Sequence, residues 1–130
     1  MPADCTLRAV AFVALGGALG CVLRYFAGVW LTRSDWPWGT IFVNLLGSFV
    51  IAAFLFGGIA RGWFGPDARF FFVTGVLGGF TTMSSFAYET MAFVEDKELY
   101  RATLYAAVTV VGSLGMAALG RAAANLVPGA

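Results

Sequence analysis

The chain has 130 residues, of which 60% are hydrophobic and 12% are charged, and it contains no histidine. Soluble domains are about 45–50% apolar and about a quarter charged, so a soluble core of this length cannot bury so much apolar surface. The formal net charge is +1 without a basic run, so no nucleic-acid partner is expected. Without histidine the chain has no Ser/His pair or Cys/His cluster, which argues against a zinc site and against an enzyme.

Four apolar blocks predict an all-α membrane protein with one four-helix transmembrane domain. The blocks run over residues 7–31, 38–60, 69–94 and 99–127, approximately. Each exceeds the roughly 20 residues that a bilayer crossing needs, so the lipid membrane is the expected surrounding. Four tryptophans lie near the block ends, as in interfacial aromatic belts: Trp30, Trp36, Trp38 and Trp63. The apolar run continues past a faint lipoprotein-like site at residues 18–21, so cleavage is not expected; Cys5 and Cys21 are expected to be free thiols.

Basic residues divide equally between the two sides of such a four-span protein. One side holds Arg8, Arg61, Arg69 and Arg121, and the other holds Arg24, Arg33, Lys97 and Arg101. The positive-inside rule therefore gives no preferred orientation. Either the charges are too few to decide, or the chain inserts both ways and pairs with an inverted copy. Four helices alone hardly enclose a water-filled route, so an oligomer is expected, and the Gly16–Gly20 GxxxG pattern favours close helix contacts.

Polar residues form stripes on two of the predicted spans. Thr40, Asn44 and Ser48 are spaced four residues apart on span two, and Tyr105, Thr109 and Ser113 repeat that spacing on span four. Two interpretations stay open. In the first, the hydroxyls bond the backbone of their own helix and the asparagine amide joins two helices. In the second, the stripes line a polar pathway. No carboxylate lies at the centre of a span. Hydroxyl and amide donors suit a small anion, and the positive edge of the Phe86 ring would be a further, weak contact.

The third span is interrupted by the stretch GVLGGFTTMSSF at residues 75–86. Gly78 and Gly79 cost a helix roughly 1 kcal/mol each relative to alanine. The pair indicates either a broken helix that presents free backbone carbonyls to a cation, or a close helix crossing that requires glycine. The residues alone leave both interpretations open.

The chain resembles the Fluc (CrcB) family of fluoride channels along almost its whole length. The resemblance rests on GGALGCVLRY at 16–25, WPWGTIFVNLLGSF at 36–49, GVLGGFTTMSSF at 75–86 and YAAVTVVGS at 105–113. It implies a passive fluoride-selective channel that exports cytoplasmic fluoride across the inner (plasma) membrane of a prokaryotic cell. It also implies an antiparallel, dual-topology homodimer with two pores, and a third helix that is broken near its centre. A structural sodium ion at the dimer centre would be held by the backbone carbonyls of Gly78 and Thr81.

The resemblance also assigns residues to the fluoride pore. They are Asn44, Phe86, Thr40, Ser84, Ser85, Tyr105, Thr109 and Ser113, with Arg24 and Glu89 matching a first-helix arginine and a carboxylate near the end of the third helix. Met83 departs from the family pattern: in the family, the first of two pore phenylalanines occupies this position. Methionine is apolar and flexible but has no positive ring edge, so fluoride conduction is expected to persist with an altered rate or pore geometry.

Two other functions compete with the channel. A small proton-coupled multidrug antiporter would suit the size and charge balance, but it needs a membrane-embedded carboxylate in an early span. Spans one and two have none, and Glu89 is late in span three. A non-transporting membrane scaffold would use the polar stripes only to bond other helices.

Overall fold

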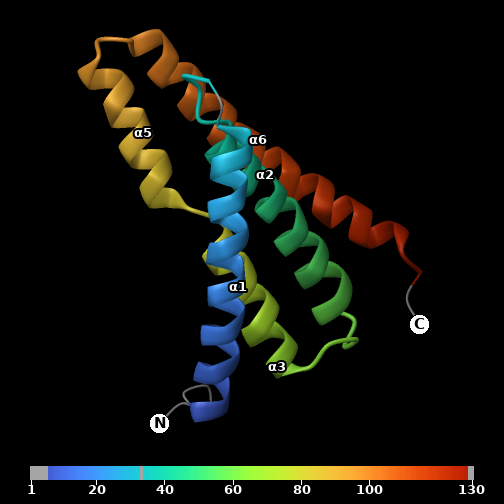
Figure 1. Ribbon diagram of the computed structural model, residues 1–130. Helices are drawn as coiled ribbons and strands as arrows, with labels where there is room; N and C mark the ends of the chain where they lie inside the picture. The colour runs from blue at the N-terminus through green and yellow to red at the C-terminus, as the bar shows by residue number, and fades with distance from the viewer. Residues whose placement is uncertain (1–5, 33, 129–130) are drawn as a thin grey trace.

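The four apolar blocks form four long helical crossings in the computed structural model, which describes residues 6–32 and 34–128 (Figure 1). In chain order the elements are α1 (Leu7–Leu31), α2 (Trp38–Ala53), η1 (Phe54–Ile59), α3 (Pro66–Ala68), η2 (Arg69–Leu77), α4 (Gly78–Phe80), α5 (Met83–Glu95) and α6 (Leu99–Leu126). The segments η1 and η2 are π-helical. The four crossings are long and apolar enough to span a membrane, and the described residues contain no strand. The predicted all-α, four-helix membrane fold is therefore confirmed.

Local sequence signals set the helix ends. The Thr6 side chain caps α1 by accepting a hydrogen bond from the Ala9 amide at 3.2 Å. The third crossing starts at Pro66, three residues before the predicted block, because proline is favoured in a first helical turn. Gly62 has a φ of +73°, which the turn between η1 and α3 requires and which L side chains rarely adopt.

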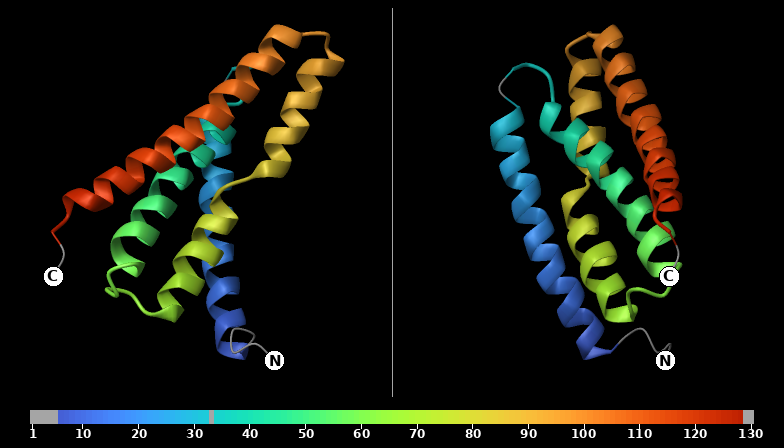
Figure 2. Two further views of the ribbon diagram at one scale, coloured as in Figure 1. Left: turned by 180° about the vertical axis from the view of Figure 1, so that it is seen from behind. Right: turned by 90° about the vertical axis from the view of Figure 1, so that its right-hand side faces the viewer.

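The third crossing is broken, but the break lies beyond the two glycines. Gly78 keeps helical dihedral angles, whereas Thr81 and Thr82 are extended, with ψ of 156° and 118°. Figure 2 shows this extended link between the lower half of the crossing and α5, which leans away from α1. The predicted interruption near the centre is confirmed, and the two threonines rather than the glycines carry it.

One of the two glycines, Gly79, serves a close helix crossing instead. A Cβ on Gly79 would lie 2.7 Å from the carbonyl oxygen of Gly17 on α1. The GxxxG residues oppose the same crossing, because a Cβ on Gly16 would lie 2.3 Å from the Phe71 oxygen and one on Gly20 would lie 2.1 Å from the Val76 oxygen. A helix break and a close helix crossing therefore both occur in the interrupted span, at different residues, and the GxxxG pattern packs within one subunit.

The helices pack as two pairs that share a small apolar core. α1 packs along η2 and α4, and α2 packs along α6. A short turn joins α5 to α6, which runs back beside it. One core cluster contains Ile41, Phe86, Phe93, Ala102 and Tyr105, and another contains Ala27, Val43 and Phe80. Large apolar side chains cover the outside, as a lipid-facing or subunit-facing surface requires. Cys21 is an exposed free thiol; Cys5 and Arg33 lie outside the described residues.

Candidate functional site

Asn44 of α2 bonds both backbone groups of Thr82 at the helix break. Its amide nitrogen donates to the Thr82 carbonyl at 3.0 Å, and its amide oxygen accepts from the Thr82 N–H at 2.8 Å. Both residues are buried. An extended residue inside a membrane must find partners for its backbone, and the asparagine supplies both of them. Asn44 therefore stabilises the broken conformation.

The same contact frees a carbonyl one turn earlier. In an uninterrupted helix the Thr82 N–H would donate to the carbonyl of Gly78, four residues back. Because that N–H donates to Asn44 instead, the Gly78 carbonyl loses its usual partner. The Thr81 carbonyl accepts a hydrogen bond from the Arg24 guanidinium at 3.2 Å, and an oxygen with two lone pairs can accept a second contact. Neither carbonyl is therefore saturated by the hydrogen bonds of the described residues.

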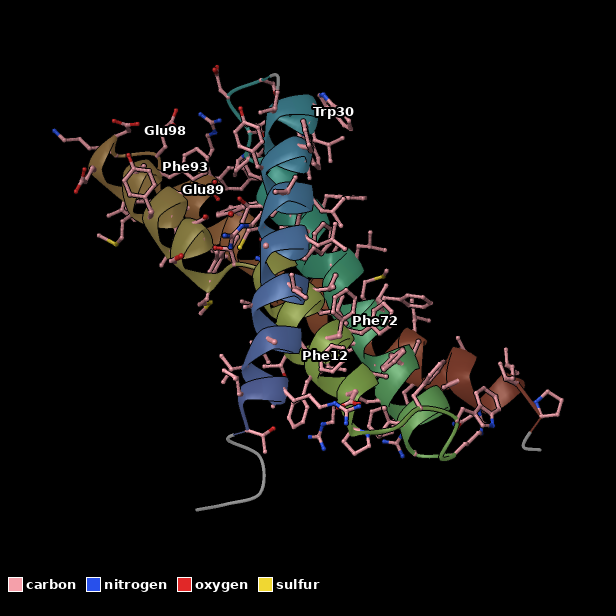
Figure 3. The ribbon with its side chains drawn as sticks, turned by 60° about the horizontal axis from the view of Figure 1, so that its bottom comes forward. Phe12, Trp30, Phe72, Glu89, Phe93 and Glu98 are labelled. Carbon is pink, nitrogen blue, oxygen red and sulfur yellow. The ribbon has the colours of Figure 1, made fainter. Side chains whose placement is uncertain are left out.

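Glu89 joins α5 to α2 and α6 through two hydroxyl groups. The Thr40 hydroxyl donates to one carboxylate oxygen at 2.8 Å, and the Tyr105 hydroxyl donates to the other at 2.5 Å. Tyr105 is completely buried. Figure 3 shows Glu89 on the side of α5 that faces the other helices. Glu89 lies in the middle of α5 and late in the whole third crossing, and its two hydrogen bonds place it in the polar interior.

Two cavities lie against the broken crossing. The α6 cavity, of about 520 Å³, is lined by Asn44, Ser48, Gly78, Thr81, Thr82, Met83, Phe86, Thr109 and Ser113, together with apolar residues. The α1 cavity, of about 590 Å³, is lined by Cys21, Arg24, Thr32, Thr40, Thr82, Ser85 and Glu89, together with apolar residues and glycines. Thr82 lines both cavities, so the Asn44–Thr82 pair lies between them, whereas Thr40 and Glu89 line the α1 cavity alone.

Thr109 is a hydroxyl donor without a partner. Its side-chain oxygen is buried and has no hydrogen-bond partner among the described residues, although Thr109 lines the α6 cavity. A buried polar group without a partner is costly, so most such groups in native proteins are satisfied. Because the oxygen itself has almost no accessible surface, an occupant of the cavity would reach it only after the side chain rotates.

The predicted polar stripes divide between the two interpretations. Ser48 donates to the carbonyl of Asn44 on its own helix at 2.6 Å, which is simple backbone bonding. Thr40 and Tyr105 instead bond Glu89, and Thr109 and Ser113 line the α6 cavity.

All residues assigned by resemblance line one of the two cavities, except Ser84 and Tyr105. Met83 and Phe86 line the α6 cavity, whereas Arg24 and Ser85 line the α1 cavity. Met83 is 73% exposed in the single chain. Ser84 is exposed and lines neither cavity; its hydroxyl lies 3.3 Å from that of Thr82.

Thr82 is the residue that the sequence-based assignment missed. Its hydroxyl accepts from the Ser85 amide and caps α5, while its backbone meets Asn44. The available signal was a threonine directly before an apolar helical run, which is a typical N-cap. A cap at mid-span also places the start of a new helix, and with it the break.

Two cavities with polar residues in their walls, one against each side of a broken helix in a four-helix membrane domain, are typical of a small membrane transport protein. The family model described as CrcB-like protein, Camphor Resistance (CrcB), matches residues 11–121. The chain therefore belongs to the CrcB family.

Curated relatives cover most of the chain. The "Fluoride-specific ion channel FluC" of Bordetella petrii is 45% identical over 113 residues, which are 87% of this chain and 88% of the relative. Proteins of the same name from Anaeromyxobacter sp. (strain K) and a Thermus thermophilus strain are 47% identical over 105 residues and 48% identical over 111 residues. These matches cover 78% and 83% of this chain, and 83% and 87% of the respective relatives.

Proposed function

We propose that the chain is a passive, fluoride-selective channel that exports cytoplasmic fluoride. The observation that carries this proposal is the cavity beside the helix break that Asn44, Thr109 and Ser113 line, in a chain similar to fluoride-specific ion channels over most of its length. Hydroxyl and amide donors can replace the water that a small, strongly hydrated anion loses. Fluoride enters cells as neutral HF, dissociates inside, and leaves through the pore down its electrochemical gradient.

The proposed route runs from one cavity to the other past the helix break. Asn44, Phe86, Thr109 and Ser113 form its wall in the α6 cavity, together with Met83. The part of the route near Thr82 and Glu89 includes Thr40, Ser84, Ser85 and Tyr105. Tyr105 and Thr40 donate to Glu89 in the single chain, so these hydroxyls are held in fixed places. Arg24 in the α1 cavity adds positive charge that favours anion entry.

We infer that the working unit is an antiparallel homodimer with two pores, in the inner membrane of a prokaryotic cell. Two features support it. The α6 cavity is open on the single chain and Met83 beside it is exposed, so a second copy is needed to enclose a route. The balanced basic residues also permit insertion in both orientations.

A structural sodium ion would fit at the break, held by the backbone carbonyls of Gly78 and Thr81. The described residues contain no cluster of His, Cys, Asp or Glu that could hold a metal, so carbonyl oxygens are the available ligands, and hard cations prefer oxygen. Gly78 is exposed, so an inverted copy could bring a matching pair. When bound, the ion supplies positive charge that links two subunits. We expect the purified dimer to unfold at higher temperature in sodium than in N-methyl-glucamine; equal unfolding temperatures would contradict the site.

The experiment that tests the function is fluoride efflux from liposomes that contain the purified chain. We expect fluoride release that follows an imposed membrane potential and needs no proton gradient. A scaffold would release none. A proton-coupled antiporter would depend on its only candidate carboxylate, so Glu89→Gln distinguishes the two: the channel keeps passive fluoride flux, and the antiporter loses transport.

A further inference from the structure

A third cavity lies apart from the proposed fluoride route. This groove, of about 490 Å³, runs between the end of η1 and the outer face of α3 and η2, and it shares no lining residue with the other two cavities. Arg69 and Thr74 supply its polar wall, and Ile59, Phe64 and Phe70 supply apolar wall. We call it the Arg69 groove. It therefore combines a cation with an apolar slot.

The charge of Arg69 is uncompensated. Its guanidinium is exposed and forms no ion pair within residues 6–32 and 34–128. The nearest acidic residue in the sequence, Asp67, is paired with Arg8 of α1. Apart from Asp67, the carboxylate side chains in the described ranges lie on the other half of the chain's crossings: Asp35, Glu89, Glu95, Asp96 and Glu98. Within the single chain, the end that holds the groove therefore carries an excess of positive charge.

Further arginines at that end lack carboxylates as well. Arg61 stacks on Trp63 and Arg121 stacks on Phe56, with cation–ring distances of 5.3 and 5.0 Å, and neither forms an ion pair in the part of the chain that the structure describes. Arginine and tryptophan together are typical of a membrane–water interface. The groove thus lies where lipid headgroups meet acyl chains.

The groove also has the polarity gradient of a phospholipid. Arg69 lies near the start of the third crossing, where headgroups are expected, and a guanidinium matches phosphate with paired hydrogen bonds. Phe70 and Thr74 lie further along the same crossing, toward the centre of the membrane. A polar mouth and an apolar wall fit one molecule that has an anionic head and a hydrocarbon tail.

We propose that the Arg69 groove binds an anionic phospholipid, with the phosphate on the Arg69 guanidinium and an acyl chain against Phe70 and Ile59. The proposal does not depend on which ion the protein conducts. It goes beyond general attraction of a basic end to anionic membranes, because it assigns one retained lipid to one cavity.

The test is native mass spectrometry of the full-length protein after reconstitution with equal amounts of phosphatidylglycerol and phosphatidylcholine. We expect the wild-type protein to retain phosphatidylglycerol preferentially. Arg69→Gln should weaken that binding by about tenfold or more, since a hydrogen bond to a charged group is lost. Arg121→Gln is the matched control: it removes the same charge at the same end but does not line the groove. Thr74→Leu fills the groove without changing charge and should also displace the lipid.

Several results would overturn the proposal. Equal losses for Arg69→Gln and Arg121→Gln would show that only overall charge matters. Retention of phosphatidylglycerol by both Arg69→Gln and Thr74→Leu would place the lipid elsewhere, and displacement by inorganic phosphate would make the site an anion site without a tail. Loss of subunit pairing in Arg69→Gln would assign the groove to a second copy. Fluoride efflux, measured in parallel, should stay near wild type in each of these variants.

Discussion

Among single residues, Met83 stands where the resemblance to fluoride channels predicts a pore phenylalanine, so it bears directly on the proposed pore. It lines the α6 cavity beside Phe86 and is largely exposed in the single chain. A thioether is polarizable and flexible, but it lacks the positive edge that an aromatic ring offers to an anion. Met83 therefore tests whether a ring is needed at this position.

We expect Met83→Phe to keep fluoride conduction but to change its rate by about threefold or more, because one anion contact of roughly 1 kcal/mol is gained and the space narrows. Efflux from liposomes measures the rate. Met91→Phe is the control, since Met91 is also exposed on α5 but does not line either pore cavity. If Met83→Phe changes neither rate nor structure, Met83 is only a spacer.

Tyr105 is the second residue whose role can be separated from its packing. Tyr105→Phe keeps the buried ring against Trp36 and Phe93 but removes the hydroxyl that donates to Glu89. The unsatisfied carboxylate oxygen should lower the free energy of unfolding by about 1–3 kcal/mol. Thermal unfolding in detergent measures this change, with Tyr100→Phe on the exposed surface as the control. An equal, small effect of both variants would contradict a structural role for the hydroxyl.

At the scale of elements, the broken crossing organises the site. The extended pair Thr81–Thr82 ends α4 and starts α5, and Asn44 supplies the hydrogen bonds that the interrupted helix cannot. The break also directs α5 away from α1 and makes room for the α1 cavity. A change at Asn44 should therefore act on the whole third crossing.

We expect Asn44→Ala to reduce fluoride flux by at least about tenfold, because it leaves both Thr82 backbone groups unpaired and removes a donor from the cavity wall. Asn44→Asp retains an acceptor but loses the donor and adds a repelling charge, so it should abolish flux. Thr103→Ala is the control: the Thr103 hydroxyl donates only to the Leu99 carbonyl of its own helix, and Thr103 lines neither pore cavity. Wild-type flux in both Asn44 variants would exclude this residue from the pore.

The contact between α1 and the third crossing gives a prediction for stability. A Cβ on Gly20 would overlap the Val76 carbonyl, whereas a Cβ on Gly17 would meet nothing within 4 Å. Gly20→Ala should therefore lower the free energy of unfolding by about 1–3 kcal/mol through overpacking, and Gly17→Ala should not lower it. Thermal unfolding of the two variants in detergent measures the difference in stability, and both glycines lie on α1. Equal unfolding temperatures would show that the two helices can move apart at Gly20 without loss of stability.

The sequence predicted the elements well and the contacts only in part. Length and apolarity predicted four crossings, since a bilayer imposes both. The glycines and hydroxyls of residues 78–82 predicted an interruption, but propensity could not decide which residues stay helical; the partner from α2 decides that, and it is distant in sequence. In the same way, the pairing of Glu89 with Thr40 and Tyr105 joins three helices, so no local pattern could reveal it.

In the whole molecule, acidic residues are distributed unequally between the two ends of the chain's crossings. Basic residues are shared between the two ends, but carboxylates concentrate near the α5–α6 turn. An inverted pair would set the acidic end of one copy at the same membrane face as the basic end of the other, which evens out the charge on both faces. Inverted pairing would also enclose the α6 cavity, which one chain leaves open.

The most direct test of the central claim compares fluoride and chloride efflux from the same liposomes that contain the purified protein. We expect rapid release of fluoride, driven by the membrane potential, and a far lower chloride flux, because the larger anion does not fit among the donors at Asn44 and Thr109. Asn44→Asp serves as the inactive reference. Equal rates for the two anions would contradict the selective pore, and no fluoride release would contradict the channel.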